Sequence, residues 1–477
     1  MPDYTRIFDD GPETLDETPT DGHGELPSGL SGTFLRNGPG VSHVGDRRLH
    51  FLDGYAFVAA ARFDGGELHV RGRHVPTPLW LEERPAGTQR VRRAFTNKPG
   101  RWSNLLDTKV GNPAGHDVVA WAGAVWACDV GGWFALDPAT LERSSRPNVT
   151  TKAPAQLGPM PRPDANTGRL VCYRVEPGLR DTVVVEERDA TMAVVSTARH
   201  ALPAAGHALH DAVATERHLV VQSFGKVSVP TLLWGAASVV DAIGMDGAIY
   251  VVPRGPSGRV HRIEVPPGQH GFHLFNAYER DGVVVVDAVV YEGRVDFRVL
   301  YPPGFPDVPP PGEARGPFPT RFTLDLATGR SEARRLACPP VEAPEVDGRF
   351  HGRPHRWGFG PTPADAGDEP TRSGYPWFHG VARVDFEGDA HATWSAGPRV
   401  FCSPPAFAPR GDAEGDGWLL TWLLDCERGR TGVAVLDATD VARGPVAARW
   451  LTRALPGVSH VSWAPAAATG GAIHTGR

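Results

Sequence analysis

The sequence predicts an all-β protein, because short apolar runs rich in valine alternate with turn residues along the chain. Its 477 residues include 56 glycines and 46 prolines, which divide it into runs such as 116–137, 181–197 and 281–293. Turn residues at 163–168 and 279–282 are typical of hairpin connections between neighbouring strands. So much strand in one chain favours a β-propeller, which repeats four-stranded blades around an axis.

Composition limits the classes of protein to consider. The chain is 41% apolar and 22% charged with a formal net charge of −6, which indicates an ordinary globular protein without a nucleic-acid partner. It contains no run of about twenty apolar residues, and its N-terminus is acidic where a secretory signal would be basic and then apolar. A cytoplasmic location is therefore expected. The five cysteines stand singly, which argues against a disulfide framework and a cysteine-based zinc site.

The expected organisation is one propeller domain over residues 31–465. We expect residues 1–30 to form a flexible acidic tail and residues 466–477 to form a C-terminal tail. The segment that ends near Trp463 is expected to close the ring against a strand from the N-terminal part. The best helix candidate is the apolar stretch 230–244.

Three histidines stand at predicted strand ends: His210, His273 and His460. They lack the close spacing of a helical zinc motif, so a shared site would have to be assembled from distant segments. The inner strands of a propeller converge on its axis and would allow this. Taken singly, each histidine is more simply explained as a hydrogen-bonding residue at a strand end.

Six segments, in the same order, resemble signature segments of the carotenoid cleavage oxygenases. They are LSGTFLRNGPG (30–40), HFLDGYAFV (50–58), GWFALDPATLE (132–142), LHDAVAT (209–215), FHLFNAYE (272–279) and GVSHVSW (457–463). The resemblance implies a seven-bladed β-propeller with a loop and short-helix cap over the axial site. It also implies one non-haem Fe(2+) held on the axis by four histidines.

By this resemblance, His210, His273 and His460 match three of the four iron ligands. The segment that carries the remaining ligand matches residues 161–170 without a gap, and it places Met160 where a histidine is expected. A thioether is a poor substitute for imidazole on ferrous iron. Met160 is therefore an altered ligand position, and it either fills the space as apolar packing or leaves a weak contact or an open coordination position.

The family also supplies glutamates that hold the ligating histidines, and this chain keeps one of three. Glu342 matches the first, whereas Val130 and Pro404 stand at the other two positions. Asp129 lies one residue before Val130, and on a regular strand its side chain would point to the opposite face unless a bulge intervened. The loss of two carboxylates together with one ligand indicates a changed site.

Three interpretations of function remain open at this point. The protein is an iron-dependent dioxygenase that cleaves a conjugated C=C bond of an apocarotenoid-like or aryl-alkene substrate, with no catalytic residue beyond the metal centre. Alternatively, a remodelled three-histidine metal site performs isomerisation or another oxidation, or the propeller is a metal-free binding module. Three ligand-type histidines and Glu342 favour an enzyme.

The expected partners are a small apolar substrate and O2, and the sequence leaves the oligomeric state open. Relatives that cleave hydroxylated stilbenes carry a lysine in the segment matching 126–132, and this chain has none there, which disfavours that substrate class. The stretch 230–244 either contacts a membrane surface to collect a lipophilic substrate or packs as an ordinary cap helix.

Overall fold

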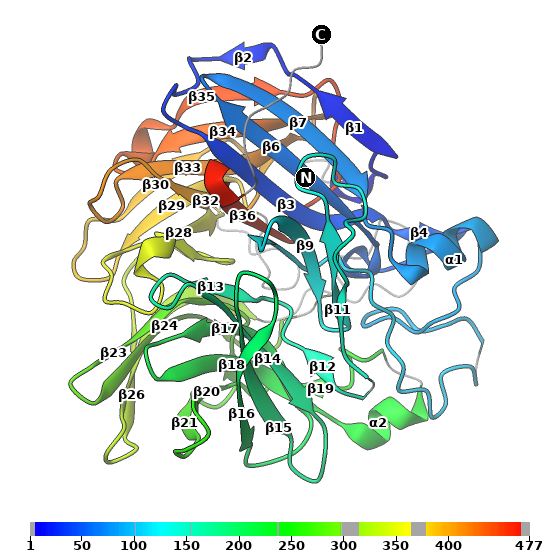
Figure 1. Ribbon diagram of the computed structural model, residues 1–477, viewed down its shortest axis with the longest axis vertical. Coiled ribbons are helices and arrows are strands. Elements are labelled where there is room, and N and C mark those ends of the chain that lie inside the picture. Colours follow the sequence, from blue (N-terminus) through cyan, green and yellow to red (C-terminus); the bar gives the residue numbers. More distant parts are fainter. Residues whose placement is uncertain are drawn as a thin grey trace.

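Seven antiparallel sheets of four to six strands surround one axis in the computed structural model (Figure 1). This arrangement confirms the predicted β-propeller. The structure describes residues 5–100, 102–152, 154–235, 238–295, 297, 314–363 and 378–468.

The first four blades follow the chain in order. The first contains β1 (Thr14–Glu17), β3 (Gly32–Val41), β6 (Tyr55–Asp64), β7 (Glu67–His74) and β36 (His460–Pro465). The second contains β8 (Asp117–Trp121), β9 (Ala124–Asp129), β10 (Gly132–Leu136) and β11 (Val149–Thr150). The third contains β12 (Gln156–Leu157), β13 (Arg162–Asp164), β14 (Arg169–Glu176), β15 (Thr182–Arg188) and β16 (Val194–Ala201). The fourth contains β17 (His207–Ala214), β18 (His218–Val227), β19 (Ile243–Gly244), β20 (Ala248–Pro253) and β21 (His261–Glu264).

Three further blades complete the ring. The fifth contains β22 (Gln269–His270), β23 (Leu274–Arg280), β24 (Val283–Glu292), β25 (Arg315–Asp325) and β26 (Ser331–Arg335). The sixth contains β27 (Glu345–Val346), β28 (Trp357–Thr362), β29 (Gly380–Asp385) and β30 (Ala392–Ser395). The seventh contains β2 (Asp21–His23), β31 (Val400–Cys402), β32 (Ala406–Pro409), β33 (Gly417–Asp425), β34 (Arg430–Asp437) and β35 (Pro445–Trp450). A separate hairpin pairs β4 (His43–Val44) with β5 (Arg47–Arg48).

The C-terminal strand closes the ring, as the sequence predicts. β36 pairs with β3 so that Trp463 lies opposite Phe34 and His460 lies opposite Asn37. Packing between blades supplies the core, for example where Ile249 of the fourth blade and Phe322 of the fifth lie in one buried cluster. A closed ring leaves few sheet edges unpaired, which holds the inner strand ends in fixed positions.

The prediction of a flexible N-terminal tail is wrong for residues 14–23. β1 adds an outer strand to β7, and β2 pairs with β35 of the last blade. Leu15 is buried in the core cluster that also contains Phe34. Pairing satisfies the backbone groups at two otherwise open sheet edges, which outweighs the polar composition of this segment. The expected C-terminal tail lies outside the described residues from 469 onward.

The helices are short. The expected helix over 230–244 is reduced to α2 (Val229–Trp234), because Gly235 adopts a left-handed conformation with φ 72° and ends it. α1 (Pro78–Ala86) was not expected; Thr77 caps it by accepting a hydrogen bond from the N–H of Trp80. Single 3-10 turns are η1 (Thr5–Phe8), η2 (Phe51–Asp53), η4 (Gly348–Phe350), η5 (Val441–Arg443) and η6 (Ala466–Ala468).

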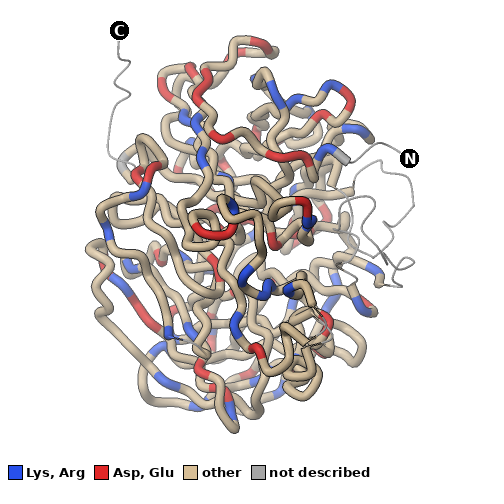
Figure 2. The backbone as a smooth tube through the Cα atoms, turned by 90° about the vertical axis from the view of Figure 1, so that its right-hand side faces the viewer, with Lys and Arg blue, Asp and Glu red and all other residues tan. Residues whose placement is uncertain are grey.

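Local turn chemistry also agrees with the sequence. β23 and β24 are joined by Asp281 and Gly282, which have φ of 52° and 79°, the conformation of a tight two-residue hairpin. Figure 2 shows acidic and basic residues interspersed over the side of the molecule that faces the viewer. No single-sign patch dominates that view. This mixed charge agrees with the small net charge of the sequence.

A buried ion pair holds α1 against the segment that follows it. Arg93 Nη2 lies 2.7 Å from Glu83 Oε2, and both side chains are almost completely buried. The other oxygen of Glu83 accepts hydrogen bonds from the backbone N–H groups of Arg90 and Val91. These contacts fix the segment that carries Phe95 into the axial cavity described below.

We expect Glu83→Ala to lower the free energy of unfolding by about 3–5 kcal/mol, because it leaves the buried Arg93 without its counter-ion. Denaturant unfolding followed by tryptophan fluorescence measures this. The matched control is Glu82→Ala, which removes an exposed neighbour and should change stability by less than about 0.5 kcal/mol. Equal effects of the two substitutions would contradict a role for the ion pair.

Candidate metal centre and substrate cavity

Four imidazole rings converge on the propeller axis. His116 directly precedes β8, His210 belongs to β17, His273 directly precedes β23, and His460 begins β36. The ring centroids of His116 and His210 lie 4.7 Å apart, and those of His210 and His273 lie 4.8 Å apart. The centroids of His273 and His460 are 5.0 Å apart, as are those of His460 and His116. The four rings thus form a closed circuit contributed by four different blades.

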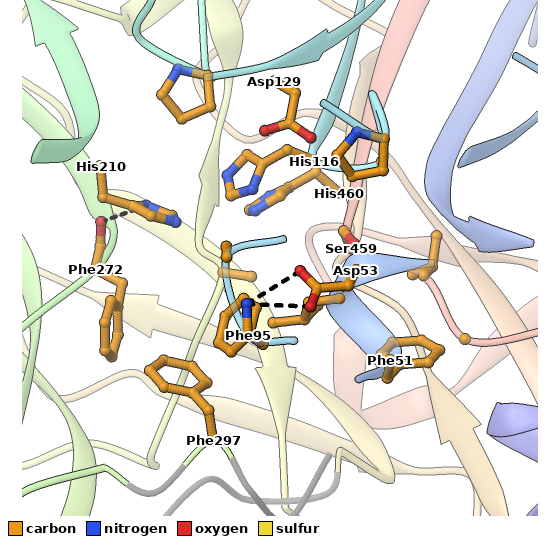
Figure 3. Close-up of a pocket in the computed structure, with 18 of the residues that line it drawn as sticks. Phe51, Asp53, Phe95, His116, Asp129, His210, Phe272, Phe297, Ser459 and His460 are labelled. Atoms are coloured by element: carbon orange, nitrogen blue, oxygen red, sulfur yellow. Dashed lines mark hydrogen bonds between the residues drawn. The ribbon is translucent and has the colours of Figure 1, made fainter. Parts of the chain in front are cut away.

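Three of these histidines, His210, His273 and His460, were predicted from the sequence, and His116 was not. His116 stands in the segment GHDVVAW, whose pattern predicts only the start of a strand. Figure 3 shows His116, His210 and His460 at one end of a common cavity. Only the spatial arrangement of the blades reveals that His116 joins them.

Hydrogen bonds orient two of the four rings. The Nδ1 atom of His273 lies 2.5 Å from Glu342 Oε2, and that of His210 lies 3.1 Å from the carbonyl oxygen of Phe272. These contacts leave Nε2 of each ring directed away from its partner, the usual arrangement of a metal-binding histidine. Glu342 is fully buried and also accepts a hydrogen bond from the Tyr291 hydroxyl.

The four imidazoles offer nitrogen donors that suit one metal ion. The Nε2 atoms of His116 and His273 are buried without a hydrogen-bond partner in the described part of the chain. His74 and His270 also have such atoms, so what distinguishes this site is the convergence of four rings. Imidazoles that share one metal at about 2.1 Å from each nitrogen have ring centres roughly 4.5–5.5 Å apart. The observed separations match this spacing.

The rings do not yet have final ligand geometry. Among the described residues, no group of three or more His, Cys, Asp or Glu side chains is already arranged to hold a metal. The separations between neighbouring ring centres are those of imidazoles that share one metal ion. We therefore consider the donor set a fit for one metal ion.

Burial keeps most of the cluster uncharged. It lowers the pKa of His116 to about 3 and holds the pKa values of His210 and His460 well below the ordinary value, with neighbouring imidazoles adding to the effect. Burial acts on His273 in the same direction, but the Glu342 carboxylate outweighs it and raises the pKa of this ring. Neutral imidazole is the form that binds a metal.

Asn37 connects two of the segments that carry the clustered histidines. It is fully buried in β3, directly opposite His460. Its side-chain amide donates hydrogen bonds to the carbonyl oxygens of Ala114, at 2.7 Å, and Asp117, at 2.8 Å. His116 lies between these two residues, so one side chain fixes the position of its backbone relative to His460.

The altered positions surround the same centre. Met160 is 5% exposed and borders a small cavity of about 20 Å³ together with His273 and His460. Pro404 borders both this small cavity and the main one, and Val130 borders the main one. Neither Val130 nor Pro404 can accept a hydrogen bond through its side chain from an imidazole N–H. The structure therefore places all three at the centre.

An apolar cavity of about 360 Å³ begins at the four histidines (Figure 3). Polar groups on its wall include Asp53, whose carboxylate accepts a hydrogen bond from the backbone N–H of Phe95, together with Asp129 and Ser459. Its described lining contains no lysine. The apolar part includes Phe51, Phe95, Phe224, Phe272, Phe297, Val239, Val240 and Ile243.

Comparison with known proteins decides the family. Residues 8–465 match the family model described as "Retinal pigment epithelial membrane protein", RPE65. The chain belongs to the RPE65 family. This match confirms the resemblance to carotenoid oxygenases, and it covers all seven blades.

Oxygenases are prominent among the RPE65-family relatives. Apocarotenoid-15,15'-oxygenase of Synechocystis sp. is 27% identical over 97% of this chain and 96% of its own length. Isoeugenol monooxygenase of Pseudomonas nitroreducens is 27% identical over 93% of each chain. Lignostilbene-alpha,beta-dioxygenase isozyme III of Sphingomonas paucimobilis is 26% identical, also over 93% of each.

Solved structures of the same family share the fold. A variant of Synechocystis apocarotenoid oxygenase superposes with a TM-score of 0.84 at 26% identity, covering 97% of this chain and 98% of that one. The cobalt-substituted Synechocystis enzyme gives a TM-score of 0.83 at 27% identity with the same coverage. The seven-bladed propeller of this chain is therefore the fold of its RPE65-family relatives.

We expect Asn37→Ala to destabilise the centre, because two buried carbonyl oxygens lose their donor at about 1–3 kcal/mol each. Denaturant unfolding should show that the free energy of unfolding falls by about 2–6 kcal/mol. Asn166→Ala, at an exposed turn, is the control and should have little effect. Unfolding curves of Asn37→Ala that overlay those of the unsubstituted protein would contradict the proposed link between the two segments.

Proposed function

We propose that this protein is a ferrous-iron-dependent oxygenase that cleaves a conjugated C=C bond of an apolar substrate. The observation that carries the proposal is the closed circuit of four imidazoles at the inner end of an apolar cavity. His116, His210, His273 and His460 would hold the iron. When bound, ferrous iron supplies the binding and activation of O2 beside the alkene.

The protein's own residues orient the ligands and the substrate. Glu342 fixes the ring of His273, and the carbonyl group of Phe272 fixes that of His210. Each contact selects the tautomer that leaves Nε2 available to the metal. The aromatic wall excludes water and holds an apolar chain against the centre, so that the scissile bond is positioned by shape.

The cavity supports an apocarotenoid-like substrate more than a phenolic one. Its described wall is built largely from phenylalanine and aliphatic side chains and lacks a lysine that could hold a phenol. The relative 27% identical over nearly the whole chain is named an apocarotenoid oxygenase, whereas others act by name on isoeugenol and lignostilbene. An aryl-alkene therefore remains the second substrate to test.

We expect protein purified with ferrous iron to hold close to one iron per chain and to consume O2 when given an apocarotenal. His210→Ala should reduce the iron content at least about ten-fold, because it removes a buried ligand. Elemental analysis and an oxygen electrode measure the two quantities. The control is His43→Ala, which removes a partly exposed imidazole outside the cavity and should retain iron.

Each other result has a definite meaning. Negligible iron in the unsubstituted protein would contradict the proposal and favour a metal-free binding propeller. Stoichiometric iron without O2 consumption on apocarotenals or aryl-alkenes would contradict alkene cleavage and favour isomerisation or another oxidation.

We also propose that the region around α2 contacts a membrane surface from which a lipophilic substrate is taken. Val229 is 50% exposed and Trp234 is 65% exposed. The loop that carries Leu106, 70% exposed, is hydrogen-bonded to α2 through the Leu233 carbonyl. These side chains form one exposed apolar region beside the Val239 and Val240 end of the cavity. No helix in the described part of the chain has the length and hydropathy needed to cross a bilayer.

We expect the protein to co-sediment with zwitterionic phosphatidylcholine vesicles. Trp234→Glu should reduce the bound fraction several-fold, because a charge replaces an apolar side chain that would enter the membrane surface. Leu179→Glu is the matched control, since Leu179 is fully exposed in the β14–β15 connection and remote in sequence. Equal binding of both variants would contradict a specific role for α2.

A further inference from the structure

A carboxylate stands at the end of the strand that pairs beside His116. β8 and β9 pair antiparallel with Asp117 opposite Cys128, and His116 and Asp129 directly adjoin these two paired residues. The backbone N–H of His116 donates a hydrogen bond to the Cys128 carbonyl oxygen at 3.3 Å, so the two segments remain together at this point.

The two side chains face the same cavity. His116 and Asp129 both belong to its lining, and Figure 3 shows both side chains at the same end of the cavity. On a regular strand, the side chains of Asp129 and Val130 would point to opposite faces of the sheet. β9 ends at Asp129 and a turn follows, so this alternation does not extend to Val130, and Asp129 and Val130 both border the cavity.

The His116 ring and the Asp129 carboxylate have no charged hydrogen-bond partner among the described residues. Neither ring nitrogen of His116 makes a hydrogen bond within the described residues, and Asp129 forms no ion pair there. The Asp129 carboxylate accepts a hydrogen bond from the Val130 N–H at 2.7 Å and faces the backbone N–H groups of Ala114 and Gly115. Its carboxylate oxygens retain acceptor capacity for an imidazole N–H.

We propose that His116 and Asp129 are a relocated ligand and its positioning residue. His116 supplies the imidazole that the Met160 position lacks, and Asp129 orients His116 as Glu342 orients His273. This inference rests on the proposed metal centre and adds to it the residue that makes the fourth ligand effective. One hairpin, β8–β9, thereby provides both the ligand and the carboxylate.

Relocation is physically simple in a propeller. His116 and Met160 lie just before the inner strands β8 and β13 of adjacent blades, and both strands start beside the axis. Met160 lines one small cavity together with His273 and His460, two members of the four-ring circuit. An imidazole at either position can therefore approach the same centre. The chain has methionine at one position and histidine at the other.

The test uses cobalt(II) added to metal-free full-length protein, with the visible absorption spectrum and a chelator competition as readouts. The unsubstituted protein should bind one cobalt. Asp129→Asn should weaken cobalt binding about 10–100-fold, the usual effect of losing a carboxylate that orients a ligand. His116→Ala should weaken binding at least as much. Asp129→Glu should recover part of the affinity lost in Asp129→Asn.

A second background separates positioning from general damage. The double substitution His116→Ala with Met160→His places the imidazole at position 160, just before β13, and should recover cobalt binding. In that background Asp129→Asn should change affinity by less than about two-fold, because Asp129 no longer has a ligand to orient. Glu342→Gln is the positive control and should weaken binding in both backgrounds, since His273 is present in each.

The outcomes distinguish the proposed metal centre from the proposed roles of His116 and Asp129. If the unsubstituted protein binds no cobalt, both the proposed centre and this inference are overturned. If it binds cobalt and His116→Ala binds equally well, the centre stands and the relocation is wrong. If His116→Ala loses cobalt but Asp129→Asn does not, or if Asp129→Asn acts equally in both backgrounds, the positioning role is overturned. Near-ultraviolet circular dichroism checks that each variant is folded.

Discussion

The Asn37 side chain is the contact on which the geometry of the centre depends. Its amide donates to the carbonyl oxygens on both sides of His116, while its backbone pairs opposite His460. The first strand of the ring, the last strand and the second blade therefore meet at one buried residue. Closure of the propeller by β36 thus also assembles half of the histidine cluster.

The other half is fixed by the blades that carry His210 and His273. Glu342 lies just before β27 of the next blade, and its carboxylate forms a hydrogen bond with His273. The cluster is held by contacts between blades more than within them, so its rigidity derives from the packing of the whole ring. On such a scaffold, an imidazole can stand on either of two neighbouring inner strands without displacing the other histidines.

Sequence patterns predicted the fold well because each pattern has a local cause. The valine-rich runs became strands, Asp281–Gly282 became a tight hairpin, and the segment near Trp463 closed the ring. The N-terminal tail and the long cap helix were predicted incorrectly. β1 and β2 are stabilised by pairing with strands distant in sequence, and α2 ends early at a left-handed Gly235.

The site was harder to predict, because its decisive neighbours belong to different blades. His210, His273, His460 and Glu342 stand in recognisable segments, but His116 does not. The proximity of His116 to the other three histidines follows from the pairing of β8 with β9 and from the Asn37 contacts. No local sequence pattern predicts either of these. The sequence also predicted that the Asp129 side chain would face away from the position of Val130, because regular strand alternation was assumed past the end of β9.

X-ray absorption spectroscopy of the iron-loaded protein tests the central claim most directly, because it reports the atoms bound to the metal. We predict a first shell of nitrogen and oxygen only, with outer-shell scattering that fits four imidazoles. The same spectrum of His116→Ala should fit three. A sulfur scatterer in the first shell, which would indicate Met160, or three imidazoles in the unsubstituted protein would contradict the account.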